Sequence, residues 1–157
     1  MSRFERVDDE IRCTFHRAEY DLVMALYEQL SGVIAHQDPD DQRFRRLFPP
    51  AVLGTQMAEP DPSQIHWRQN LLTSHGQWLA SATLHRGIYK LRFAVEDVDA
   101  ILQFINDLRL MIGASIDIDV FDRDTLPADD DRQTQLAIID HLAWWQEEIL
   151  SLISDDV

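Results

Sequence analysis

Residues 97–113, DVDAILQFINDLRLMIG, decide the fold that this sequence predicts. A helix turns by about 100° per residue, so this stretch gathers its apolar side chains on one wide face. An apolar arc of about 180° is wider than a surface helix needs and predicts neighbours on more than one side. Gly113 is a suitable C-terminal stop. The apolar face holds Val98, Ile101, Leu102, Phe104, Ile105, Leu108, Met111 and Ile112, and the polar side holds Asp99, Gln103, Asn106 and Asp107.

Arg109 interrupts the apolar face of this predicted helix, between Ile105 and Ile112. A buried guanidinium without a partner is strongly destabilising, so the residue needs an explanation. It is either a site arginine that awaits an anionic ligand or a structural arginine, paired internally or lying along the core with its head group in water. The structural interpretation is favoured. We expect the partner to be Gln146 or Glu147, with Glu19 as the alternative acid.

Length and charge limit the possible classes of protein. The chain has 157 residues with 45% hydrophobic content, and we expect residues 1–157 to form a single domain. The net charge of −14 opposes non-specific binding to nucleic acid or to anionic membranes. No signal peptide and no membrane-spanning run is recognisable. Cys13 is the only cysteine, which excludes an internal disulfide and fits the cytoplasm; we expect it to serve packing.

Three further helices and three strands are predicted around the central helix. Apolar periodicity indicates helices over residues 18–36, 63–86 and 132–153, with Ser63 as an N-cap and Gly87 as a stop. The second of these carries His75 on its apolar face, where we expect a core residue, and Trp67 on the same face. Alternation indicates a hairpin over residues 4–15, turning at Asp8-Asp9, and a strand over residues 88–93 that pairs with it.

The remaining segments are less regular. Residues 43–46, RFRR, are the only basic cluster, and acidic neighbours favour a self-neutralising surface turn over a nucleic-acid contact. Residues 115–131 are acidic and predict a short strand or a tight loop. They resemble a calcium loop only superficially, because the required glycine and the final glutamate are missing. Asp129, Asp130 and Asp131 are expected to start the last helix.

The sequence contains no recognisable catalytic motif. It has no paired histidines or cysteines at zinc spacing, no glycine-rich phosphate loop and no nucleophile elbow. We therefore predict no catalytic residues, no metal and no cofactor. The missing motifs count against an enzyme without excluding one.

Several segments together resemble an actinobacterial family of domains of unknown function. They are Phe4-x-Arg6, YEQLSGVI at residues 27–34, LFPPA at 47–51, FINDLRLMIG at 104–113 and LAWWQEEI at 142–149. The resemblance spans nearly the whole chain. It implies no established activity, a gene neighbourhood shared with the protease adaptor ClpS and, in some members, a transcriptional-regulator label.

Carried over by position, the motif residues of the family are Asn106, Asp107, Arg109, Gln146 and Glu147, which suggests a polar lock between two helices. The chain departs from the family pattern in two places. Asp8-Asp9 replaces Asp-Gly in the hairpin turn, and His16 replaces a capping serine or threonine.

We expect a mainly α fold, a helical bundle around the central helix, with a small antiparallel β-sheet at one edge. For function we favour a cytoplasmic protein-binding or regulatory module that binds a partner protein or a second copy of itself. Trp144, on the polar side of the last helix, is the candidate contact residue. The alternatives are a DNA-binding regulator and a small-ligand binder or enzyme that uses Arg109.

Overall fold

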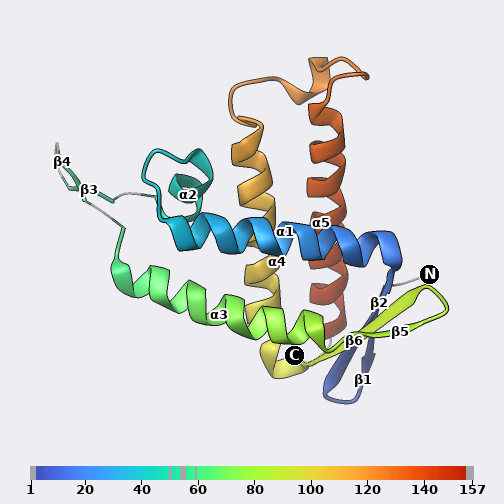
Figure 1. Ribbon diagram of the computed structural model, residues 1–157. Helices are drawn as coiled ribbons and strands as arrows, with labels where there is room; N and C mark the ends of the chain where they lie inside the picture. The colour runs from blue at the N-terminus through green and yellow to red at the C-terminus, as the bar shows by residue number, and fades with distance from the viewer. Residues whose placement is uncertain (1–2, 50, 54–55, 59, 155–157) are drawn as a thin grey trace.

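The computed structural model describes residues 3–49, 51–53, 56–58 and 60–154. The predicted class is confirmed, because helices dominate and a four-stranded antiparallel sheet lies at one edge (Figure 1). The helices are α1 (Arg17–His36), α2 (Gln42–Leu47), α3 (Pro62–Ala80), α4 (Val98–Ser115) and α5 (Arg132–Ile153).

The predicted central helix, α4, contacts each of the other four helices. It runs beside α5, while α1 and α3 lie across this pair (Figure 1). Most of its apolar side chains between Val98 and Ile112 are buried, and Leu102 and Leu110 are partly buried, which explains why the apolar arc is so wide. Gly113 does not end the helix. The helix continues to Ser115, and Asp117, at a φ of 52°, supplies the left-handed residue that lets the Ile118 N–H reach Gly113 O at 3.0 Å.

The edge sheet has the order β1-β2-β6-β5. Its strands are β1 (Phe4–Val7), β2 (Glu10–His16), β5 (Thr83–His85) and β6 (Ile88–Ala94). The predicted pairing of the hairpin with residues 88–93 is present, with Ile11 opposite Phe93. Cys13 is buried in this sheet, and burial raises the pKa of its thiol, as expected of a packing residue.

The second long helix begins one residue earlier than predicted, at Pro62, and ends six residues earlier, at Ala80. Asp61, not Ser63, is the N-cap, because its carboxylate accepts from Ser63 N at 2.9 Å and Pro62 occupies the first helical position. The helix ends at Ala80, and residues 83–85 form β5. Arg86 and Gly87 have φ values of 53° and 78° and form the turn of a β5–β6 hairpin.

Two segments predicted as irregular contain regular structure. The basic cluster forms the short helix α2, and the short strands β3 (Ala51–Leu53) and β4 (Gln56–Ala58) pair after it. Asp41 caps α2 and accepts from Arg43 Nε at 3.1 Å, and this hydrogen bond lowers the pKa of Asp41. The charge of Arg43 is therefore neutralised by an acidic neighbour, as predicted.

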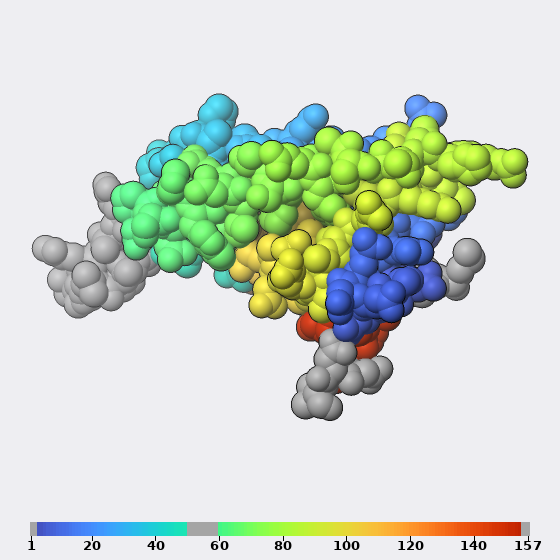
Figure 2. Space-filling view, turned by 90° about the horizontal axis from the view of Figure 1, so that it is seen from below, coloured from blue at the N-terminus to red at the C-terminus, as the bar shows by residue number. Residues whose placement is uncertain are grey.

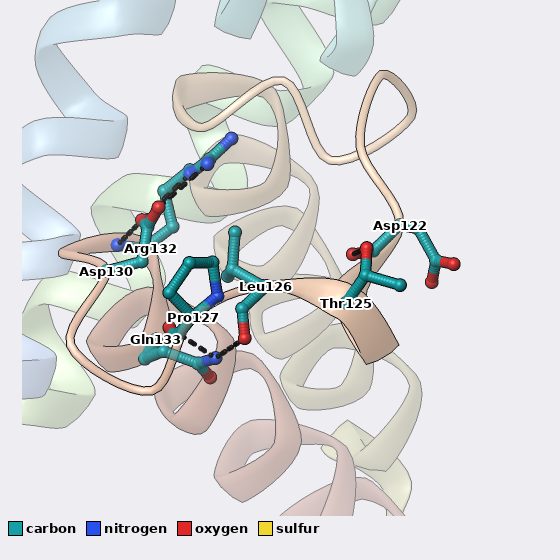
Figure 3. A network of polar contacts seen from close by, with 7 residues as sticks. All are labelled: Asp122, Thr125, Leu126, Pro127, Asp130, Arg132 and Gln133. Carbon is teal, nitrogen blue, oxygen red and sulfur yellow. Dashed lines mark hydrogen bonds and ion pairs between the residues drawn. The ribbon is translucent and has the colours of Figure 1, made fainter.

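Residues 116–131 contain no strand and instead form turns and a 3₁₀ turn, η2 (Arg123–Thr125). A polar network joins this loop to the start of α5 (Figure 3). Asp130 accepts from Arg132 N and from Arg132 Nε, both at 2.9 Å, and the side-chain bond lowers the Asp130 pKa to about 2. The Gln133 amide donates to Leu126 O and Pro127 O. Asp130 thus serves the helix start, as the acidic run predicted.

Gly76 of α3 lies against the Tyr27 side chain of α1. A Cβ atom at this position would collide with the Tyr27 hydroxyl, which donates to Leu72 O at 2.9 Å. We expect Gly76→Ala to lower the free energy of unfolding by about 1–2 kcal/mol, because the Tyr27 ring has to move. Gly32→Ala is the matched control. Gly32 lies in α1 with open space around it, so that change is expected to be neutral or slightly stabilising in urea unfolding. Equal effects of the two changes would contradict the packing argument.

Candidate ligand-binding site

The helical periodicity predicted that Asp107 lies on the polar, solvated side of α4. In the structure Asp107 is instead buried against α3. Both of its carboxylate oxygens lie 2.8 Å from Arg68 Nη1, and the Gln103 amide donates to one of them at 2.9 Å. The exposed fraction of Asp107 is only 4%. Burial raises its pKa to about 6, against the opposing effects of Arg68 and Gln103. Asp107 therefore forms a buried ion pair with Arg68, and Arg109 is not part of this pair.

Arg109 faces the other way, toward α5. Its Nη1 donates to Gln146 Oε1 at 2.6 Å, which is one of the two contacts that the sequence predicted. The Gln146 amide nitrogen donates to Leu102 O at 3.3 Å, so Gln146 connects the two helices. Glu147 is exposed. Glu19, the alternative acid, is engaged elsewhere, at 3.0 Å from Arg3 and 3.1 Å from His141.

The five motif residues do not form one cluster. Asp107 is paired with Arg68 of α3, and Arg109 is bonded to Gln146 of α5. Asn106 lines a surface cleft together with Arg109. Glu147 makes neither contact and is exposed.

This surface cleft has a volume of about 850 Å³ and lies between α2, α4 and the loop that follows α4. Arg45 and Arg46 reach it from α2, and Arg109 reaches it from α4. We call it the arginine cleft. Its lining comprises Gln42, Arg45, Arg46, Asn106, Arg109, Leu110, Gly113, Ala114, Asp117, Ile118, Asp119, Val120 and Ile139.

The arginines of this cleft have no carboxylate partner among the described residues. Within residues 3–49 and 60–154, Arg45, Arg46 and Arg109 make no ion pair. In the same part of the chain, the buried Arg109 Nε has no hydrogen-bond partner. Asp117 and Asp119 also line the cleft. The Gln42 amide nitrogen donates to Asp117 Oδ1 and to Ala114 O. The cleft therefore offers guanidinium groups to an anionic group.

Three other residues singled out from the sequence have distinct environments. His75 is a core residue, as predicted, with a ring stacked on Phe104 at a centroid distance of 4.7 Å. Trp144 is 40% exposed and its ring lies 5.7 Å from that of His141. Trp67 is half-exposed rather than buried, and it covers the Arg68 guanidinium at 5.7 Å.

Among the described residues, no three histidine, cysteine or carboxylate side chains are grouped as a metal site would require. None of the described helices is both long enough and apolar enough to cross a membrane.

The chain thus has a mainly α fold with a sheet at one edge and a surface cleft lined by three arginines. The chain belongs to a domain-of-unknown-function family, DUF2017, whose sequence model matches residues 1–153. No curated protein and no solved structure is detectably similar to the chain.

Proposed function

We propose that the chain is a protein-binding, regulatory module without catalytic activity, and that the arginine cleft is its docking site for an acidic segment of a partner protein. The observation that carries the proposal is the convergence of Arg45, Arg46 and Arg109 on one cleft. In a chain with 28 acidic and 14 basic residues, three arginines without carboxylate partners in the described part are unexpected unless an external anion uses them.

The walls of the arginine cleft suit a polypeptide better than a bare ion. A guanidinium group binds a carboxylate in a bidentate fashion, so several arginines favour a segment with several acidic side chains. Leu110, Ile118 and Ile139 add apolar contact area, and Val120, which is 82% exposed, extends it at the rim. Trp144, on α5, is the second surface that we propose for partner contact.

The partner is proposed to be another cytoplasmic protein or a second copy of this acidic chain. Gel filtration combined with light scattering separates these two cases. ClpS, the protease adaptor that the family resemblance implies as a gene neighbour, is one named protein to include in the binding assay. A monomer that binds neither ClpS nor any acidic peptide would argue against the proposal.

Neutralising Arg45 and Arg46 is expected to weaken binding of a fluorescent hexaglutamate peptide about tenfold, because two exposed charge contacts are lost. These two side chains are exposed, so Arg45→Gln/Arg46→Gln leaves the core intact, whereas Arg109 also holds Gln146. Arg17→Gln/Arg123→Gln removes the same charge from exposed arginines outside the cleft and is the control. Equal losses in the two double variants would show that the peptide responds only to overall charge.

A small anionic ligand is the second candidate, because a volume of about 850 Å³ suits such a molecule and Arg109 and Asn106 both line the cleft. Citrate is the probe. If citrate binds and displaces hexaglutamate, the cleft is a metabolite site, and turnover assays then test for an enzyme that uses Arg109.

DNA binding remains the third hypothesis and is opposed by the net charge of −14. A titration of a 20-base-pair duplex at two salt concentrations tests it. Salt-dependent affinity that is lost with Arg45 and Arg46 would favour the regulator hypothesis.

A further inference from the structure

A second cleft, also of about 850 Å³, lies at the other end of α4. It is bordered by the β1–β2 turn, by α3 and by the 3₁₀ turn η1 (Val95–Asp97). Figure 2 shows this face, with the start of α4 in yellow between α3 in green and the β1–β2 hairpin in blue. We call it the acidic cleft, because Asp8, Asp9, Glu10 and Asp97 all line it.

The two arginines of the acidic cleft are both committed to one carboxylate. Arg12 Nε lies 3.3 Å from one oxygen of Glu10, and Arg92 Nε lies 3.6 Å from the other. In the described part of the chain, Asp8, Asp9 and Asp97 make no ion pair. The cleft therefore presents uncompensated negative charge.

His75 of α3 also lines the acidic cleft. The residue is only 4% exposed. Among the described residues, its ring nitrogens have no hydrogen-bond partner. Burial lowers its pKa to about 4, so the ring is neutral at pH 7 and keeps one nitrogen as an acceptor.

The aromatic wall of the acidic cleft is apolar and fixed. The Trp78 indole N–H donates to Arg92 O at 3.0 Å, so this donor is already used. The Trp78 ring meets Phe93 edge to face at 5.8 Å, and both rings line the cleft. Their π-faces and edges accommodate an alkyl chain or a cation.

We propose that the acidic cleft binds an alkylammonium group, with Asp9 and Asp97 balancing its charge, His75 accepting one N–H and Trp78 contacting the alkyl chain. An ammonium carries three N–H donors and no acceptor, which matches a site of carboxylates and a neutral imidazole. The site involves none of the residues of the arginine cleft, so it stands or falls independently of the proposed function.

The first test measures binding by calorimetry at pH 7 with two sources of the group. Spermidine represents a free polyamine, and a blocked peptide with one lysine represents a protein side chain. Asp97→Asn is expected to weaken binding about fivefold, the loss of one exposed ion pair. Asp99→Asn, two residues away and outside the cleft lining, is expected to leave the affinity unchanged.

His75→Leu is the second variant, and a thermal melt checks that it folds. It is expected to weaken binding of whichever probe binds, because the acceptor is lost while the charges remain. Binding of spermidine alone assigns the site to free amines, and binding of the peptide alone assigns it to lysine side chains. No saturable binding of either probe, or equal losses in Asp97→Asn and Asp99→Asn, would overturn the proposal.

Discussion

Asp107→Ala is expected to lower the free energy of unfolding by about 3 kcal/mol, a large effect for one substitution. The carboxylate is buried, and its removal leaves Arg68, whose side chain is only 16% exposed, without a counter-charge. Arg68 cannot easily turn to water, because Phe48 and Trp67 contact its guanidinium. For a chain of this size, the melting temperature is expected to fall by roughly 9 °C.

A double-mutant cycle separates the ion pair from simple loss of packing. The cycle compares Arg68→Met, Asp107→Leu and the double variant Arg68→Met/Asp107→Leu. The double variant is expected to be much less destabilised than either single variant, because neither charge is then left buried alone. Asp99→Ala, an exposed position on the same helix, is expected to change stability by less than about 0.5 kcal/mol. Urea unfolding followed by tryptophan fluorescence measures all of these variants. If the changes in the free energy of unfolding of the two single variants add up to that of the double variant, Arg68 and Asp107 are not coupled.

His75→Leu is expected to remove an acid sensitivity of up to about 3 kcal/mol between pH 6.5 and pH 4. Burial lowers the pKa of His75 from 6.5 to about 4. In this window the unfolded chain binds a proton that the folded chain excludes, so acidification stabilises the unfolded chain. The contribution of His75 to stability is complete above pH 6.5 and is lost as the pH falls to about 4.

Asp107 acts with the opposite sign in an overlapping window. Burial raises its pKa from 3.8 to about 6, so the folded chain binds the extra proton, and acidification from pH 6 to 3.8 adds stability. The two contributions offset each other in the wild type. Stability relative to wild type should therefore rise on acidification in His75→Leu and fall in Asp107→Asn. Unfolding curves measured between pH 4.5 and 7 test this, and parallel profiles would contradict both assignments.

The fold was predictable where one segment carried its own periodicity. The apolar stripe of residues 97–113 and the alternation in residues 10–16 each reflect burial on a defined face, and both were identified correctly. The error at residues 81–87 arose because Ala82 continues the spacing of the preceding helix. Gly87 was the signal in the sequence for a hairpin turn, and the structure shows positive φ at both Arg86 and Gly87.

The candidate site was predictable only in part. Arg109 and Gln146 each interrupt an apolar face, and two such interruptions on neighbouring helices are expected to meet. Asp107 was misplaced because periodicity cannot reveal a third helix approaching the polar side, where Arg68 lies. The arginine cleft itself depends on α2 packing against α4, which is tertiary information absent from the local spacing of Arg45 and Arg46.

The strand order has a consequence for how this protein is made. Ile11 pairs with Phe93, and Phe15 stacks on Trp145 at 4.8 Å, so the N-terminal hairpin is completed by segments translated much later. At about 5–20 residues per second, the ribosome leaves this hairpin without its apolar cover for several seconds. The timing of translation, rather than the stability of the finished fold, therefore sets how long the nascent chain is exposed to aggregation.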